Sequence, residues 1–204
     1  MPEITMNDEF GRAIRRTIEA LDVGSVIEVG SWDGTGSTAV LIHALEERPD
    51  RRLTCIEPNP ERFAALQSFT EQQEWVTPVC QRSVSRASMT PQTFDDVWHS
   101  PYNRLPYNEG TVRAWWGEQR DGPGYLDSLT SETWDAALID GCEFCGYDDF
   151  RLLKDRVRVL MFDDVFRAYK CARAHEELIL DSGWSCIWSS AFYRNGASIW
   201  ARLA

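Results

Sequence analysis

The sequence predicts an α/β fold with a sheet of seven strands, mostly parallel, with helices on both faces and a C-terminal antiparallel hairpin. Three observations lead to this prediction. Short apolar runs alternate with helical stretches, the first such run ends in a glycine-rich turn that leads into a helix, and an Asn-Gly pair separates two β-rich runs near the C-terminus. Such a sheet is Rossmann-like. The length of 204 residues suits one domain, so we expect residues 1–204 to form a single domain.

The first half of the chain alternates between helix and strand. Phe10, Ile14 and Ile18 fall on one helical stripe, and Pro60 suits the first turn of a helix, where its missing N–H costs nothing. Helices between apolar strands imply parallel strands that are covered on both faces. The elements expected here are a helix at 7–22, a strand at 26–29, a helix at 35–47, a strand at 53–57, a helix at 60–69 and a strand at 75–80.

The same alternation resumes after residue 133 and then changes character. Asn195-Gly196 lies between two β-rich runs, which is a strong signal for a hairpin. Five parallel strands followed by this hairpin complete the seven-strand plan. The elements expected in this half are a strand at 134–139, a helix at 147–154, a strand at 157–162, a helix at 166–180 and the hairpin that follows it.

Residues 86–132 follow neither the helical nor the strand period. The segment is rich in aromatic residues, proline and glycine, so it is neither a simple helix nor a linker. Loops of this length in a compact domain are usually functional. Two interpretations stay open: an irregular insertion that packs its aromatic side chains on the core, or a substrate-binding segment.

The composition narrows the range of partners. A net charge of −11 and scattered basic residues argue against a nucleic acid or a membrane surface, so we expect a small-molecule substrate; a homo-oligomer stays open. The N-terminus lacks a leader pattern and no apolar stretch could span a bilayer, which indicates a cytoplasmic protein. Three of the six cysteines lie in strand-like runs, where reduced cysteine packs as a small apolar residue, so a disulfide framework is not expected.

The turn after the first strand predicts a ligand pocket. Gly30, Gly34 and Gly36 stand where the backbone must turn sharply and approach a ligand, but their G-x-x-x-G-x-G spacing differs from the G-x-G-x-x-G of dinucleotide sites. Glu28 and Asp33 beside the turn favour a cation over a phosphate. Glu57, at the end of the second strand, could accept hydrogen bonds from both hydroxyls of a ribose. A positively charged nucleoside satisfies both requirements, and S-adenosylmethionine is one.

Five segments, VIEVGSWDGTG, CIEPNP, VCQRSVS, WDAALIDG and VLMFDDV, resemble in order and distance the motifs of class I S-adenosylmethionine-dependent methyltransferases. The last two are most similar to the metal-dependent small-molecule O-methyltransferases of the catechol and antibiotic-sugar types. The resemblance implies methyl transfer to a hydroxyl of a sugar or secondary metabolite, and a seven-strand fold with a terminal hairpin. It implies cofactor contacts from Glu28, Gly30, Ser31, Asp33, Gly36, Glu57, Pro58, Ser83, Val84 and Asp140.

Acidic residues also follow the fourth and fifth strands. Asp140 ends one and Asp163-Asp164 end the other, and the carboxyl ends of parallel strands open onto one crevice. Converging carboxylates repel one another unless a cation or protons intervene, and oxygen ligands suit Mg²⁺. The resemblance implies that these three aspartates hold a metal that binds two vicinal substrate oxygens. The alternative is that Asp163 or Asp164 caps the next helix and that no metal binds.

The residue that removes the proton is less defined. Glu143 lies three positions after Asp140, where catechol-type relatives carry lysine, and His99 in the aromatic segment is the second candidate for the catalytic base. Cys142 and Cys145 form a C-x-x-C pair without a second metal-binding pair, so a redox or zinc role is a minor alternative. Two further functions stay open: a cofactor-binding module without catalysis, and a nicotinamide oxidoreductase.

Overall fold

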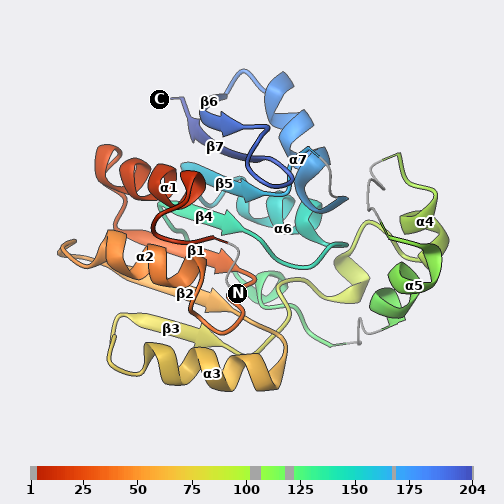
Figure 1. Cartoon of the computed structure of the whole chain (residues 1–204), viewed down its shortest axis with the longest axis horizontal. Coiled ribbons are helices and arrows are strands. Elements are labelled where there is room, and N and C mark those ends of the chain that lie inside the picture. Colours follow the sequence, from red (N-terminus) through yellow and green to blue (C-terminus); the bar gives the residue numbers. More distant parts are fainter. Residues whose placement is uncertain (1–3, 102–106, 118–121, 167–168, 204) are drawn as a thin grey trace.

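The computed structural model describes residues 4–101, 107–117, 122–166 and 169–203, and within them the predicted seven-stranded sheet is confirmed (Figure 1). The strands lie in the order β3-β2-β1-β4-β5-β7-β6. They are β1 (Ser25–Val29), β2 (Arg52–Ile56), β3 (Val76–Val79), β4 (Ala136–Ile139), β5 (Val159–Asp163), β6 (Trp184–Ser190) and β7 (Ala197–Arg202). The helices are α1 (Glu9–Ala20), α2 (Ser37–Leu45), α3 (Pro60–Thr70), α4 (Phe94–Trp98), α5 (Glu109–Gly117), α6 (Gly146–Leu153) and α7 (Tyr169–Leu180).

The strand order reverses between β1 and β4. The chain builds β1, β2 and β3 outward in one direction and then crosses to build β4 and β5 on the other side of β1, all in parallel. In sheets of this kind, ligands bind at the carboxyl ends of the strands where the order reverses. The hairpin of β6 and β7 then joins β5 in antiparallel pairing.

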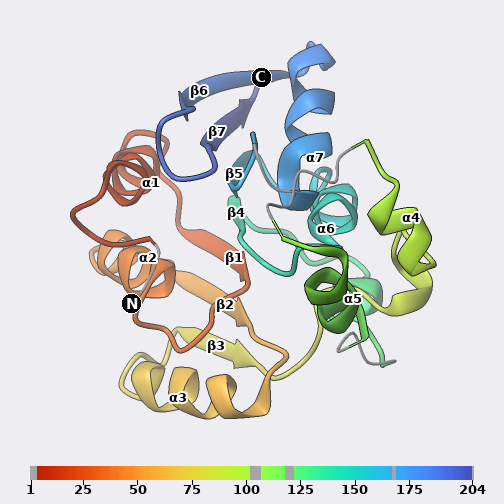
Figure 2. The ribbon, with the colours of Figure 1, turned by 45° about the vertical axis from the view of Figure 1, so that its right-hand side comes forward.

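Helices cover both faces of the sheet, as predicted (Figure 2). On one face Phe10 and Ile14 of α1 and Leu41 of α2 pack in one core with strand residues. On the other face Phe150 of α6 and Leu178 of α7 pack in a second core. Asp8 caps α1 by accepting a hydrogen bond from the amide of Gly11 at 2.7 Å, which explains where this helix begins. No helix of the described ranges has the length and apolar character needed to cross a bilayer.

The aromatic segment contains two short helices that the sequence pattern did not predict. Helix α4 has five residues and a capping box between Thr93 and Asp96, and α5 has nine residues. The five residues of α4 carry too few turns to show a period. Val112 and Trp116 of α5 are buried, so this segment packs on the core beside the carboxyl edge of the sheet (Figures 1 and 2).

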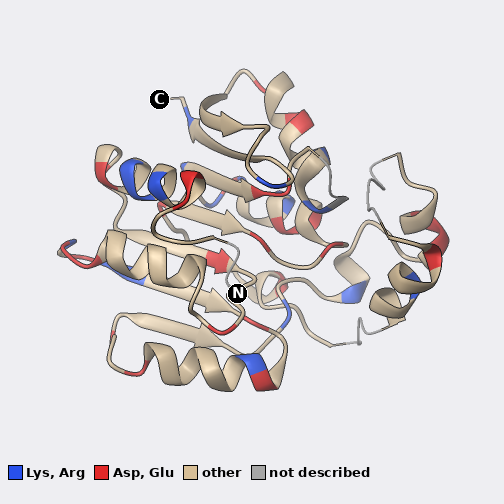
Figure 3. Ribbon diagram, viewed as in Figure 1, with Lys and Arg blue, Asp and Glu red and all other residues tan. Residues whose placement is uncertain are grey.

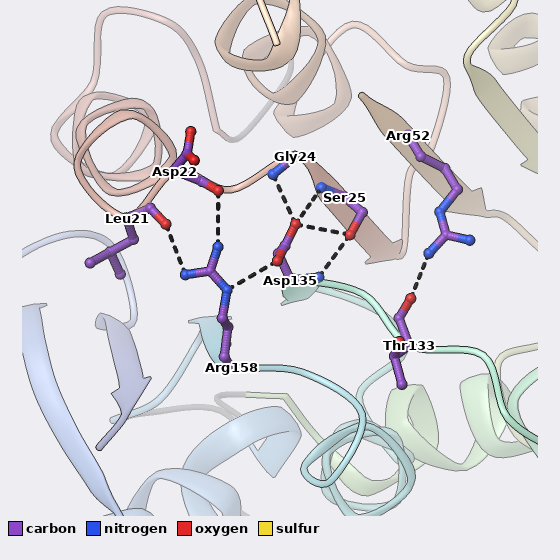
Figure 4. Close-up of polar contacts among 8 residues, drawn as sticks. All are labelled: Leu21, Asp22, Gly24, Ser25, Arg52, Thr133, Asp135 and Arg158. Carbon is purple, nitrogen blue, oxygen red and sulfur yellow. Dashed lines mark hydrogen bonds and ion pairs between the residues drawn. The ribbon is translucent and has the colours of Figure 1, made fainter. Parts of the chain in front are cut away.

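A polar network joins the loops at the opposite, amino edge of the sheet (Figure 4). The carboxylate of Asp135 accepts hydrogen bonds from the amides of Gly24 and Ser25, both at 2.9 Å. Arg158 donates to Asp135 at 3.0 Å and to the carbonyl oxygens of Leu21 and Asp22 at 2.8 and 2.9 Å. Burial alone would raise the pKa of Asp135, but these hydrogen bonds lower it below its usual value.

Candidate active site

A cavity of about 1250 Å³ opens at the carboxyl ends of β1, β2 and β4. Its wall combines the glycine turn after β1, the segment after β2, the loop after β3, the segment after β4 and Lys170 at the start of α7. Ligand pockets typically measure roughly 300–1,000 Å³, so this cavity has room for a nucleoside and a second small molecule. It lies where the reversal of strand order predicts a ligand site.

The backbone after β1 explains the need for glycine. Gly30 has a φ of 92°, and a Cβ there would lie 2.3 Å from the carbonyl oxygen of Asp140. Gly34 has a φ of 86°, and Gly36 stands at the N-terminus of α2. The amides of Gly30 and Ser31 donate to the carbonyl of Ile56 at 3.0 and 3.1 Å. The turn is therefore fixed against both neighbouring strands.

Glu28 lies beneath the glycine turn and does not line the cavity. Its fully buried carboxylate accepts hydrogen bonds from Ser31 Oγ at 2.7 Å and Thr38 Oγ1 at 2.6 Å, and burial raises its pKa. The cofactor contact predicted for Glu28 has no counterpart in this geometry, because the side chain points into the protein and shapes the turn. Ser31 itself lines the cavity.

Asp33 provides a negative charge at the cavity wall. Its carboxylate accepts hydrogen bonds from the amide of Thr35 at 3.0 Å and from Thr35 Oγ1 at 2.7 Å. These hydrogen bonds lower the pKa of Asp33, so the group is ionised at neutral pH. An ionised carboxylate at this position favours a cationic ligand, as the sequence predicted.

Glu57 is buried at the end of β2 and lines the cavity together with Pro58. One carboxylate oxygen accepts from the amide of Trp32 at 3.0 Å and the other from the amide of Asn59 at 2.9 Å. Burial raises the pKa of this group despite these hydrogen bonds. Each carboxylate oxygen has a further lone pair, so the orientation fixed by the two amides leaves capacity to accept from two hydroxyl groups.

The loop after β3 completes the wall of the cavity. Ser83 and Val84 are buried and line it, and their contact with a cofactor stays a prediction. The amides of Tyr125 and Leu126 donate to the carbonyls of Arg82 and Ser83, both at 2.8 Å. The end of the aromatic segment therefore holds this loop in position. Trp115 and Gly117 from the same segment also line the cavity.

The three aspartates after β4 and β5 do converge, and acidic residues are visible there in Figure 3. Carboxylate oxygens of Asp140, Asp163 and Asp164 lie within 4.8 Å of one another. The ammonium of Lys170 lies 2.7 Å from Asp140 Oδ1 and 2.9 Å from Asp164 Oδ2. Arg194, in the turn between β6 and β7, lies 3.1 Å from Asp163 Oδ2. The cluster thus already contains cations that belong to the chain.

Burial and charge act in opposite directions in this cluster. Burial raises the pKa of Asp163 well above its usual value, and the negative charges of Asp140 and Asp164 beside it raise the pKa further. Burial would also raise the pKa of Asp164, but Lys170 lowers it below the usual value. Burial alone would lower the pKa of Lys170, but the surrounding carboxylates outweigh this effect and raise the pKa well above its usual value. The side chain is therefore an ammonium at neutral pH.

The donor set fits a divalent metal poorly in this arrangement. Mg²⁺ needs carboxylate oxygens at about 2.0–2.1 Å, and two of the three candidate carboxylates already contact a buried ammonium. A metal at these oxygens would share them with Lys170, whose side chain is only 6% exposed. The metal role of Asp140, Asp163 and Asp164 stays a prediction, and the position of Lys170 counts against it.

The two candidate bases lie in different surroundings. Glu143 lines the cavity, whereas His99 is exposed at the end of α4 and does not line it. The geometry therefore gives His99 no part in this site. Cys142 and Cys145 also line the cavity, with their sulfur atoms 3.2 Å apart and both cysteines reduced. Among the described residues the three aspartates are the only cluster with metal-site spacing, which gives the zinc alternative no support.

Sequence analysis missed Lys170 and Arg194. Lys170 occurs in a helix that mixes apolar and charged residues, so no motif marks it. Arg194 directly precedes the Asn195-Gly196 pair that predicted the hairpin, and no motif assigned a role to its side chain. The signal that could have found them is charge balance, because acidic residues at buried strand ends need partners of opposite charge.

Comparison with known proteins rests on structure, since no family model matches the sequence and no curated protein matches it. The O-methyltransferase from Bacillus cereus in complex with S-adenosylhomocysteine has a TM-score of 0.62 and 13% identity, covering 100% of this chain and 84% of that one. TomG from Streptomyces achromogenes is an O-methyltransferase involved in tomaymycin synthesis, solved in complex with S-adenosylmethionine. It has a TM-score of 0.63 and 15% identity, covering 100% of this chain and 84% of that one. A methyltransferase from Podospora anserina with bound S-adenosylhomocysteine has a TM-score of 0.60 and 12% identity, covering 95% of this chain and 78% of that one.

This chain has the class I methyltransferase fold. The fold expected from the sequence resemblance is therefore confirmed, over nearly the whole chain. At these identities the likeness concerns the fold, and function has to be argued from the residues of this chain. In this chain the cavity lies at one edge of the sheet, and its lining includes Asp33, Glu57 and the loop at Ser83.

Proposed function

We propose that this chain is an S-adenosylmethionine-dependent methyltransferase that acts on a hydroxyl group of a small molecule. One observation carries the proposal: the carboxylate of Glu57 and the glycine turn around Asp33 line one cavity, at the ends of two neighbouring parallel strands. S-adenosylmethionine offers ribose hydroxyls to the first and a positive charge to the second. The net charge of −11 favours a small molecule over a nucleic acid as substrate.

Each part of the proposed cofactor has a counterpart in the cavity wall. Glu57, with Pro58 beside it, accepts the ribose hydroxyls, and Ser83 and Val84 border the adenine. The turn at Gly30 allows the methionine part to lie close to the backbone, and Asp33 compensates its positive charge. These assignments would direct the methyl group toward the side of the cavity formed by the segment after β4.

Glu143 is the proposed base. It lines the cavity three residues after Asp140. In the reaction, the substrate oxygen forms a bond to the methyl carbon, and the carbon–sulfur bond breaks with its electron pair going to sulfur. The hydroxyl proton goes to the Glu143 carboxylate and then to water. A cavity that holds both molecules in line supplies the remaining effect, which is orientation.

The proposal uses no divalent metal, because Lys170 contacts two of the three carboxylates that would bind it. The aromatic segment supplies the proposed substrate wall through Trp115. A cytoplasmic location stays the expectation from sequence. A sugar or another secondary metabolite stays the expected substrate class.

Calorimetric titration of S-adenosylhomocysteine into the purified protein tests the proposed function. The wild-type protein should bind it, and Glu57→Ala should weaken binding at least about tenfold, because the ribose loses a charged acceptor. Glu61→Ala is the matched control, since Glu61 is an acid four residues further along the chain that does not line the cavity. Absence of binding by the wild-type protein would refute the proposal, as would equal binding by the wild-type protein and Glu57→Ala.

A further inference from the structure

We propose that the ammonium of Lys170 is the built-in cation of this active site and holds the acceptor oxygen of the substrate, in place of a divalent metal. The inference rests on the proposed function and adds a positioning residue and a restriction on the substrate. Lys170 lies in the first turn of α7, 5% exposed, and its side chain reaches the cavity wall.

The position of Lys170 is fixed by packing as well as by charge. A Cβ on Gly146, the first residue of α6, would lie 2.2 Å from the carbonyl oxygen of Lys170. The glycine therefore allows α6 and the start of α7 to touch. From there the ammonium contacts Asp140 at 2.7 Å and Asp164 at 2.9 Å, so one lysine joins the ends of β4 and β5.

The charges around Lys170 come from several elements. Asp140, Asp163 and Asp164 face it from the strand ends, and Glu143 adds negative charge from the segment after β4. Arg194 contributes a second positive charge, 3.1 Å from Asp163. Asn195 donates to Asp164 Oδ1 at 2.8 Å. A further divalent cation would have to displace this arrangement rather than fill a gap in it.

The ammonium has capacity for a ligand. A lysine has three N–H donors, and in the described ranges its recorded partners are Asp140 and Asp164, which use two. The third donor can reach an oxygen in the cavity that Lys170 lines. A divalent metal would bind two vicinal oxygens of a substrate, whereas the one available N–H of Lys170 can donate to a single oxygen. The geometry thus points to a substrate that needs a single acceptor hydroxyl, without a vicinal partner.

This contact would assist methyl transfer through charge. Negative charge develops on the acceptor oxygen as its proton leaves for Glu143, and a fixed ammonium next to that oxygen stabilises it. The lysine keeps its own proton throughout, so the methyl group and the hydroxyl proton are the only groups that move. The two aspartates hold the ammonium in place and do not react.

Titration with Mn²⁺ alone tests the inference, with calorimetry and thermal melting as readouts. The wild-type protein should show no saturable binding and no shift in melting temperature. Lys170→Met removes the competing cation and frees Asp140 and Asp164, so this variant should bind Mn²⁺ at least roughly tenfold more tightly and melt higher with the ion. Lys154→Met is the matched control, because Lys154 also lies between two acids, Glu177 at 3.1 Å and Asp181 at 2.7 Å.

The outcomes separate clearly. Saturable Mn²⁺ binding by the wild-type protein that Asp164→Asn abolishes would overturn the inference, and this arm needs no Lys170 variant to fold. A folded Lys170→Met that gains no affinity for Mn²⁺ would also overturn it. Gain of Mn²⁺ binding by Lys170→Met and not by Lys154→Met supports it. Binding of S-adenosylhomocysteine is measured separately, so failure of the proposed function shows as loss of that binding, whatever Mn²⁺ does.

Discussion

Acidic residues lie at both edges of the sheet, and the two edges treat them differently. At the amino edge, Asp135 receives hydrogen bonds from two backbone amides and from Arg158, and its pKa is lowered (Figure 4). At the carboxyl edge, the pKa values of Asp140 and Asp163 are raised, chiefly by burial. Asp135 is thus a stable anion at the amino edge, whereas Asp140 and Asp163 are costly anions at the carboxyl edge.

The difference shows how a fold separates stability from function. Backbone amides of Gly24 and Ser25 use acceptor capacity of Asp135 and join two loops at the amino edge. The acids at the carboxyl edge depend on side chains, and their partner Lys170 ends at the cavity. Asp163 Oδ1 is buried without a hydrogen-bond partner among the described residues. Such unsatisfied groups are tolerated where a site gains from them.

The largest effect on stability is expected for Lys170→Met. Its loss leaves Asp140 and Asp164 buried without their cation, which should reduce the free energy of unfolding by about 3–5 kcal/mol at pH 8. The carboxyl groups then have raised pKa values in the folded state, so the deficit should shrink as the pH falls and protons bind. Urea denaturation at pH 8 and pH 5 measures this. An equal deficit at both pH values would contradict a charge effect.

Asp149→Asn should change stability in the opposite direction. Asp149 is fully buried, and burial raises its pKa from 3.8 to about 7. A group with a raised pKa in the folded state makes the protein less stable as the pH rises from about 4 to about 7. Asparagine carries no charge, so the free energy of unfolding of this variant should rise by about 2–4 kcal/mol at pH 8 and change little at pH 4. The upper figure corresponds to a pKa shift of about three units. Thermal melts at both pH values check it, and a gain independent of pH would refute the explanation.

The smallest effect is expected for Asp135→Ala at the amino edge. Its side chain is 31% exposed, so solvent screens the pair with Arg158 and the loss should be about 1–2 kcal/mol. Because the pKa of Asp135 is lowered, its contribution is present above the unfolded pKa and disappears as the pH falls through the folded value. Binding of S-adenosylhomocysteine should not change.

Asp155→Ala provides the control for that variant. Asp155 also pairs with an arginine, Arg202, but its side chain is 88% exposed, so its removal should have little effect. Denaturant unfolding of both variants, together with the cofactor titration, tests the comparison directly. If Asp135→Ala weakened cofactor binding as strongly as Glu57→Ala, the two edges would not be independent.

The sequence predicted the sheet well because its strands are marked by local signals. Apolar runs, the glycine turn and Asn195-Gly196 each depend on a few neighbouring residues, and all seven strands were confirmed. Boundaries were less accurate: β5 ends at Asp163, because Asp164 adopts a φ of 59°. The helix predicted at 166–180 is described from Tyr169 onward, and residues 167 and 168 lie outside the described ranges. The five-residue helix α4 left no period to detect.

The site was predicted only in part, because its contacts are not local. Asp33 lies in the glycine turn after β1 and Glu57 directly follows β2, and both line one cavity. Glu28 has the same sequence signature, yet it points into the core. Lys170 is separated from Asp140 by 30 residues, and only the packing of α7 on the sheet brings them together. Spacing alone cannot distinguish these cases.

The turn between β6 and β7 has a consequence for the order in which the protein folds. Arg194 and Asn195 in this turn contact Asp163 and Asp164, and β7 pairs with β5, with Ala197 opposite Asp163. The acids at the end of β5 therefore remain uncompensated by these partners until the hairpin docks. A folding intermediate that contains the parallel strands alone would carry this excess negative charge. Docking of the hairpin would thus supply the last of these partners to the acids at the carboxyl edge of the sheet.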